Sequence, residues 1–300
     1  MTGAGTPADG ETSEYARLAA EHGLVRQGVR GTFGTYLRDL WRSRHFIWTL
    51  AVTRTYSRNE NTYLGQLWAI LNPLLFAGVY YVVFGLVLGT DGGVVNYPAF
   101  LVVGIFIFQF CSTALTSGAN SVVNNISMIR SLRFPRAALP ISVVLTEFLT
   151  LLPAIVVMFV LVTLTGENPS WEWLLVPPMF LVITVFNVGM ALGLSRLTHR
   201  SRDVKNIIPL VTRVLRYVSG VFFYIDHYTA KAGSTELAQL GGIVLAYQPY
   251  ALALDVIRAP LLAEFEISWL SMGVMTAWAL LAIVAGLIYF WRGEGKYGVD

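Results

Sequence analysis

The sequence predicts an all-α membrane protein with six transmembrane helices, and three observations lead to this fold class. Apolar residues make up 55% of the 300 residues and charged residues only 13%, about half of their usual share in a soluble protein. Charged residues are absent from five long windows, at 61–90, 92–129, 148–166, 173–195 and 267–291. None of these windows alternates apolar with polar residues as the strands of a membrane barrel do.

Each window contains or nearly contains the ~20 residues with which a helix crosses the hydrocarbon core. Backbone groups in that core must satisfy one another's hydrogen bonds, so we expect helices there. The transmembrane domain is predicted at 61–292, with spans at 66–88, 97–118, 139–165, 173–195, 206–225 and 267–291. The span at 206–225 is the least uniform, because Arg213 and Arg216 interrupt it.

Basic residues are distributed unevenly between the segments that join the spans. The first 60 residues hold eight arginines, and the loops at 119–138 and 196–205 and the C-terminal tail hold most of the others. The loops at 89–96 and 166–172 hold none. The positive-inside rule therefore places both termini in the cytoplasm, on a protein of the cytoplasmic membrane. This topology explains the basic composition without a nucleic-acid partner.

Three segments outside the spans have distinct patterns. Residues 1–32 are expected to be a disordered cytoplasmic N-terminus, and residues 293–300 a cytoplasmic tail. Residues 33–60 place apolar and charged residues on separate faces at helical spacing, which favours an amphipathic helix lying along the cytoplasmic membrane surface. Packing on a soluble partner is the alternative. The apolar face is assigned to Tyr36, Leu37, Leu40, Trp41 and Trp48.

The segment at 226–266 is too long for a tight outer turn. Its apolar stretch at 245–262 is interrupted by Pro249 and Pro260, so it is too short and too broken to span the bilayer. Irregular backbone at membrane depth is tolerated only where protein covers it. We therefore expect a pair of short helices that re-enter the outer leaflet.

Patterns typical of catalytic and metal sites are missing. The four histidines lie far apart and lack metal-ligand spacing, and the single cysteine can form no intrachain disulfide. Gly293 to Lys296 is similar to a phosphate-binding loop, but Tyr297 stands where Ser or Thr is required, and no strand is predicted before it. We expect no catalytic residue, no metal and no cofactor in this chain.

Aromatic residues recur every four positions in the span at 66–88, which places them on one helix face. Aromatic rings stack on the apolar faces of sugar rings, so such a ladder suits a sliding glycan. Ordinary helix packing with an interfacial aromatic belt is the alternative. Arginines within a span favour a polar path. The candidate substrate path comprises Trp68, Asn72, Phe76, Tyr80, Phe84, Arg213, Arg216, Tyr217, Phe222, Phe223 and Tyr224.

Glu147 is a further charge within a predicted span, about two turns into the segment at 139–165. A charge at this depth marks a functional site by default, usually one that faces a bundle interior or a water-filled cavity. Two structural alternatives remain open for Glu147: hydration near the membrane interface, or pairing with an arginine.

Four stretches in the same order resemble the ABC-type polysaccharide exporter permeases, the Wzm and teichoic-acid permease group. They are 61–68 with 72–75, 125–140, 219–224, and 247–249 with 258–262. Glu60, Gly220 and Gln248 differ from residues common in that group. The arginine-rich composition and long polar N-terminus are similar to those of actinobacterial members, including the mycobacterial exporters of cell-wall galactan.

The resemblance implies a permease that exports a lipid-linked polysaccharide of galactan, O-antigen or teichoic-acid type. It implies two copies of this chain and two of a separate Wzt-like subunit, which holds the ATP and Mg²⁺ and is the only enzyme. Residues 119–138 would then be the coupling segment that docks the ATPase. Its candidate residues are Asn125, Ile129, Arg130, Arg133 and Arg136, and those of the outer segment are Gln248, Pro249 and Arg258.

Three other functions remain as alternatives at this stage. One is an ABC permease for a drug or small lipid, and a second is a membrane-embedded polyprenyl-phosphate transferase. The third is a structural membrane adaptor.

Overall fold

The computed structural model describes residues 21, 32–58, 65–87, 89, 92–132, 134–201, 203–225 and 236–294. The described residues form helices joined by turns and include no strand, which confirms the predicted all-α fold. The predictions for most of 1–31, for 59–64, for Arg133 and for 295–300 fall outside the described residues.

Five helical segments among the described residues are long and apolar enough to cross a membrane. They coincide with five of the predicted spans. They are α4 (Trp68–Tyr80) continued by the π-helix η2 (Tyr81–Val87), α5 (Tyr97–Ala119), α7 (Ala138–Leu164), the 3₁₀ turn η4 (Trp171–Leu175) with α8 (Val176–Arg200), and α13 (Trp269–Trp291).

The predicted span at 206–225 contains a shorter helix, α9 (Val204–Val218). Its 15 residues extend about 22 Å at ~1.5 Å per residue, less than the ~30 Å hydrocarbon core. The chain turns at Gly220, whose φ is +73°, a conformation that glycine adopts readily. The prediction of one helix to residue 225 is therefore wrong at its C-terminal end, and the sixth span stays a prediction.

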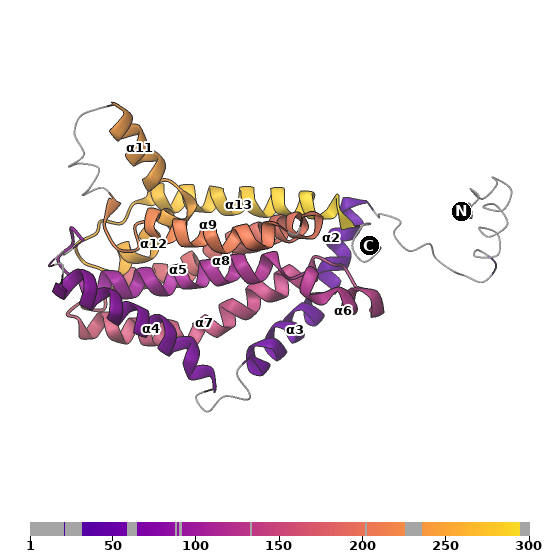
Figure 1. Ribbon diagram of the computed structural model, residues 1–300, viewed down its shortest axis with the longest axis horizontal. Helices are drawn as coiled ribbons and strands as arrows, with labels where there is room; N and C mark the ends of the chain where they lie inside the picture. Colours follow the sequence, from indigo (N-terminus) through magenta and orange to yellow (C-terminus); the bar gives the residue numbers. More distant parts are fainter. Residues whose placement is uncertain are drawn as a thin grey trace, which may run out of the picture.

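The helices form an elongated bundle (Figure 1). One end, called here the α6 end, carries α2 (Phe33–Arg42), α6 (Ile126–Ser131) and the end of α13; the other, the α12 end, carries α11 (Glu236–Ala246) and α12 (Pro249–Leu261). α5 is largely buried, whereas α4 buries only Pro73 and Ala77. Two further turns are η1 (Gly65–Leu67) and η3 (Val123–Asn125).

α8 and α13 are in close contact at two glycines. A methyl group added at Gly189 would overlap the α13 backbone, and one added at Gly286 would overlap the backbone at Gly189. The two helices therefore meet backbone against backbone, which only glycine permits at these two positions.

The amphipathic segment predicted at 33–60 is two helices, because a turn at Ser43 separates α2 from α3 (Arg44–Ser57). Tyr36 and Leu40 pack against a hydrophobic cluster at the α6 end. In contrast, Trp41 of α2 is 70% exposed and Trp48 of α3 is 53% exposed; Leu37 is exposed too. The location of this exposed aromatic face at the membrane surface stays a prediction.

The pair of short helices predicted within 226–266 is present as α11 and α12. α12 is almost entirely buried at its end of the bundle, and α11 projects from the bundle (Figure 1). Pro249 is the first residue of α12, where its missing N–H costs no helical hydrogen bond. The depth of this pair in the outer leaflet stays a prediction.

Candidate functional site

The aromatic ladder of α4 passes through three different environments along the bundle. Its first two residues, Trp68 and Asn72, line a cavity of about 140 Å³ between α4, α5, α7 and the end of α3. Phe76 lies farther along, beside Arg216 of α9. The last two residues pack against the turn that follows α9.

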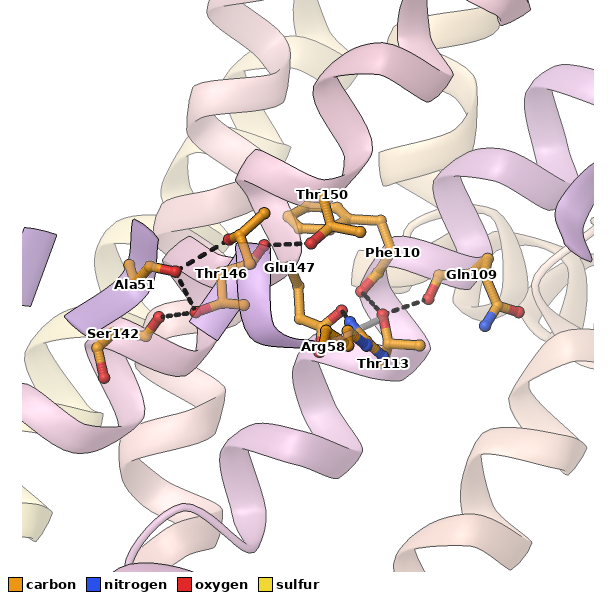
Figure 2. Close-up of polar contacts among 10 residues, drawn as sticks. Ala51, Arg58, Gln109, Phe110, Thr113, Ser142, Thr146, Glu147 and Thr150 are labelled. Atoms are coloured by element: carbon orange, nitrogen blue, oxygen red, sulfur yellow. Dashed lines mark hydrogen bonds and ion pairs between the residues drawn. The ribbon is translucent and has the colours of Figure 1, made fainter. Parts of the chain in front are cut away.

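An ion pair forms part of the cavity wall. Arg58 Nη1 donates to Glu147 Oε2 at 2.7 Å, and Figure 2 shows the two side chains pointing toward one another beside Thr113. The Glu147 side chain is 8% exposed and that of Arg58 is 41% exposed. Two of the interpretations of Glu147 therefore apply at once. Its carboxylate pairs with an arginine, and it also lines a cavity.

Two further polar contacts hold α3 against the rest of the bundle. Thr146 Oγ1, on α7, donates to the Ala51 carbonyl of α3 at 3.2 Å (Figure 2). Arg54 Nη2 donates to Asn125 Oδ1 in the coupling segment at 2.7 Å. Arg54 and Arg58 are four residues apart and so lie on one side of the chain, where one contacts the coupling segment and the other the cavity.

Arg216 joins α9 to the middle of the ladder. Its guanidinium lies 5.9 Å from the ring centroid of Phe76 and 5.4 Å from that of Phe108, within the range of cation–π attraction. Its Nη2 is also 3.4 Å from Gln109 Oε1. Arg213 does not join this contact, because its side chain is exposed elsewhere on α9.

An aromatic cluster surrounds Phe222. The Phe222 ring centroid lies 4.2 Å from that of Tyr80, 5.7 Å from Phe84 and 5.5 Å from Tyr217. The spacings to Phe84 and Tyr217 are typical of attractive aromatic pairs, and Tyr80 packs closer still. The cluster therefore unites aromatic residues that the sequence showed as two separate groups, on α4 and after α9.

The next two predicted path residues lie apart from this cluster. Tyr224 stacks edge to face on Phe265 at 5.0 Å, and its backbone N–H donates to Gly92 O at 3.0 Å. Phe223 is half-buried against the core of the bundle. Both belong to the packing of the α12 end, so the structure does not place them on the α4 face.

Arg258 of α12 holds the turn that carries Phe222. Its guanidinium donates to three backbone carbonyls, at Gly220 (2.8 Å), Val221 (2.9 Å) and Phe100 (3.2 Å), and it stacks on the Phe100 ring at 3.4 Å from the centroid. Gln248 Nε2 adds a hydrogen bond to the carbonyl of residue 218 at 2.9 Å. Arg258 and Gln248 therefore hold in place the backbone that carries Phe222.

The coupling segment combines a buried and an exposed side. Ile129 is buried and Arg130 is exposed. Arg136 binds the end of the described chain, since its backbone N–H donates to Glu294 Oε1 at 2.9 Å and its Nη1 to the Glu294 carbonyl at 2.6 Å. Burial raises the pKa of the Glu294 carboxyl, while hydrogen bonds from Arg136 and Tyr36 act in the opposite direction. Glu294, the second residue of the sequence that is similar to a phosphate-binding loop, therefore contacts the coupling segment through Arg136.

Sequence reasoning did not single out Arg54 or Arg58. Both belong to an arginine-rich N-terminal segment, where positive charge was explained by topology alone. A signal did exist, because a carboxylate within a span requires a cation. That signal could not select the partner, which is 89 positions away along the chain. Among the described residues, no cluster of potential metal ligands is present.

Comparison with known proteins identifies the family. Residues 45–232, more than half of the chain, match the ABC-2 type transporter family. Two O-antigen export system permease proteins RfbA of Klebsiella pneumoniae are each 31% identical over 170 residues, which are 56% of this chain and 65%, less than two thirds, of each relative. The O-antigen export system permease protein RfbA of Myxococcus xanthus is 25% identical over 247 residues, 82% of this chain and 94% of that relative. The chain therefore belongs to the ABC-2 type transporter family.

Proposed function

We propose that this protein is the membrane-spanning permease subunit of an ABC transporter that exports a lipid-linked polysaccharide across the cytoplasmic membrane. The observation that carries the proposal is the union of Tyr80, Phe84, Tyr217 and Phe222 into one aromatic cluster beside Arg216. Phe222 is buried and holds the rings together, while the exposed rings at its edge, Tyr217 (55% exposed) and Phe76 (45% exposed), can support a sliding glycan without fixing one register. Relatives described as O-antigen export permeases support the same class of substrate.

The exporter would contain two copies of this chain and two Wzt-like ATPase subunits that supply ATP and Mg²⁺. The ATPases would dock at the coupling segment, where α6 presents Arg130. Their movement would reach the cavity through α3, because Arg54 contacts Asn125 and Arg58 contacts Glu147. Both termini would be cytoplasmic, so that the α6 end faces the ATPases.

The substrate would approach α4 from the α6 end. Guanidinium groups are well shaped for phosphate oxygens, and the exposed Arg213 would receive the pyrophosphate of the lipid carrier. The glycan would then follow the exposed side of α4, where Phe76 is 45% exposed. Membership of a transporter family favours this reading over the transferase and the adaptor.

Depletion of the protein tests the proposal. We expect one lipid-linked saccharide to accumulate on the cytoplasmic side and to disappear from it when the wild-type chain is restored. A strain whose partner ATPase cannot hydrolyse ATP is the matched control and should accumulate the same compound. Accumulation of a small lipid or a drug, with cell-surface glycans unchanged, would contradict polysaccharide export and favour the small-molecule permease.

A further inference from the structure

The cavity at the start of the aromatic ladder has room for one small ring. Its volume is about 140 Å³, and an apolar protein cavity of ~150 Å³ holds one benzene molecule. Apolar side chains form part of the wall, with Trp68, Pro73, Phe106, Phe110 and Leu151 contributing. The six-membered ring of one sugar therefore fits, and its hydroxyl groups would reach through the open side of the cavity, whereas the second ring of a disaccharide would lie outside it.

Polar groups contribute to the same wall. The Asn72 amide and the Trp68 indole N–H hydrogen-bond to no other described residue. Thr113 and Thr150 donate their hydroxyl hydrogens to helix carbonyls, at 2.9 and 2.8 Å, so their oxygens keep lone pairs that can accept. The cavity thus offers both donors and acceptors, as a ligand with several hydroxyl groups requires.

The charge of the cavity argues against an anionic ligand. Its one cation, Arg58, is already paired with Glu147, so the formal charge of the described lining is zero. A phosphate bound to Arg58 would lie beside the Glu147 carboxylate, a like charge whose side chain is only 8% exposed, and like charges held close together repel one another. A neutral polyol avoids this cost. It can accept from the remaining guanidinium N–H groups and donate to the carboxylate while the ion pair stays intact.

We propose that this cavity binds a single neutral sugar ring. Trp68 covers the apolar face of the ring, while Asn72 and the Arg58–Glu147 pair hold its hydroxyl groups. The inference rests on the proposed function only for the source of the ring, which is then a residue of the exported glycan. The cavity lies at the α6 end of the ladder, so the ring is held before the rest of the chain reaches Phe222.

Binding to the intact complex tests the proposal. The full-length chain is co-purified with its ATPase in lipid nanodiscs, and saturation-transfer NMR measures the binding of methyl glycosides of galactose, N-acetylglucosamine, rhamnose and mannose. At least one glycoside should bind. Trp68→Ala should raise its apparent Kd about ten-fold, about 1.4 kcal/mol, and Asn72→Ala should raise it in the same direction. The exposed Trp171 and Asn168 provide the controls Trp171→Ala and Asn168→Ala, which should bind as the wild type does.

Pyrophosphate distinguishes the neutral site from an anion site. It should not displace the glycoside from the wild type. It should bind Glu147→Gln, in which Arg58 has lost its counter-charge. Displacement in the wild type, or tighter binding of a nucleoside diphosphate sugar than of its methyl glycoside, would show an anion site and overturn the proposal.

Absence of glycoside binding, or binding equal in Trp68→Ala, Asn72→Ala and both controls, would overturn it as well. Export is judged separately by the depletion experiment. A negative NMR result with an accumulated lipid-linked saccharide therefore rejects the cavity assignment alone. Glycoside binding without such accumulation rejects the exporter alone.

Discussion

Replacing Arg258 by lysine should loosen the turn that carries the aromatic cluster. The Arg258 side chain is 2% exposed, and its planar guanidinium reaches three carbonyls at once. A lysine ammonium is a compact charge without that planar fork, so we expect it to keep one carbonyl and release two. Each buried acceptor left without a partner costs about 1–3 kcal/mol, which gives a loss of about 2–6 kcal/mol for the substitution.

The assay is thermal unfolding of the purified chain in detergent, together with export in the depleted strain. A loss at the lower limit corresponds to a fall in Tm of at least about 4 °C, at roughly 2 °C per kcal/mol for a large domain. Export should fall too, because Phe222 loses its fixed position beside Tyr80. Arg200→Lys is the matched control, since Arg200 is exposed. A Tm for Arg258→Lys within about 2 °C of the wild type would refute the reasoning.

Four further outcomes are expected. Gly286→Ala should lower the Tm because its methyl group meets backbone atoms, whereas Gly273→Ala on the same helix meets open space and should not; equal Tm values would contradict the close helix contact. Tyr80→Leu should export poorly at near-normal Tm, since leucine keeps apolar volume but has no ring on which a sugar can stack. Full export would show that the ladder only packs helices together. Arg130→Glu should weaken co-purification of the ATPase without affecting membrane insertion; normal recovery of the ATPase would remove Arg130 from the docking surface. Burial raises the pKa of Glu294, so the folded state binds the proton more tightly and stability should fall as pH rises from about 5 to 7; Glu294→Gln should show a smaller fall in Tm over that range, and an equal fall would contradict the assignment.

The spans were predictable because they depend on local composition. A charge-free window of sufficient length specifies a helix in the bilayer whatever lies beside it, and five windows gave five helices. The end of α9 was not predictable in this way. Apolar residues continue beyond it to Phe223, so composition alone predicts a longer helix. The backbone instead turns at Gly220. The glycine signalled a helix end, but hydropathy does not measure chain direction.

The candidate site was only partly predictable, because its contacts join distant segments. Helical periodicity predicted one face for the ladder, whose last residue, Phe84, lies in η2 beyond the end of α4. It could not show that Phe222 would meet Tyr80 and Phe84. Nor could it show that Trp68 and Arg58 line the same cavity. Arg58 reaches Glu147 because α3 packs against α7. No local pattern in the sequence predicts that packing.

The backbone contact between α8 and α13 limits which parts of the bundle can move. At Gly189 and Gly286 no side chain separates the helices, so a rotation or shift of one against the other would drive backbone into backbone. α4, which buries few residues, has no such constraint. During a transport cycle α8 and α13 should therefore move together as one rigid unit, whereas the weakly buried α4 can shift relative to its neighbours without a backbone clash of this kind.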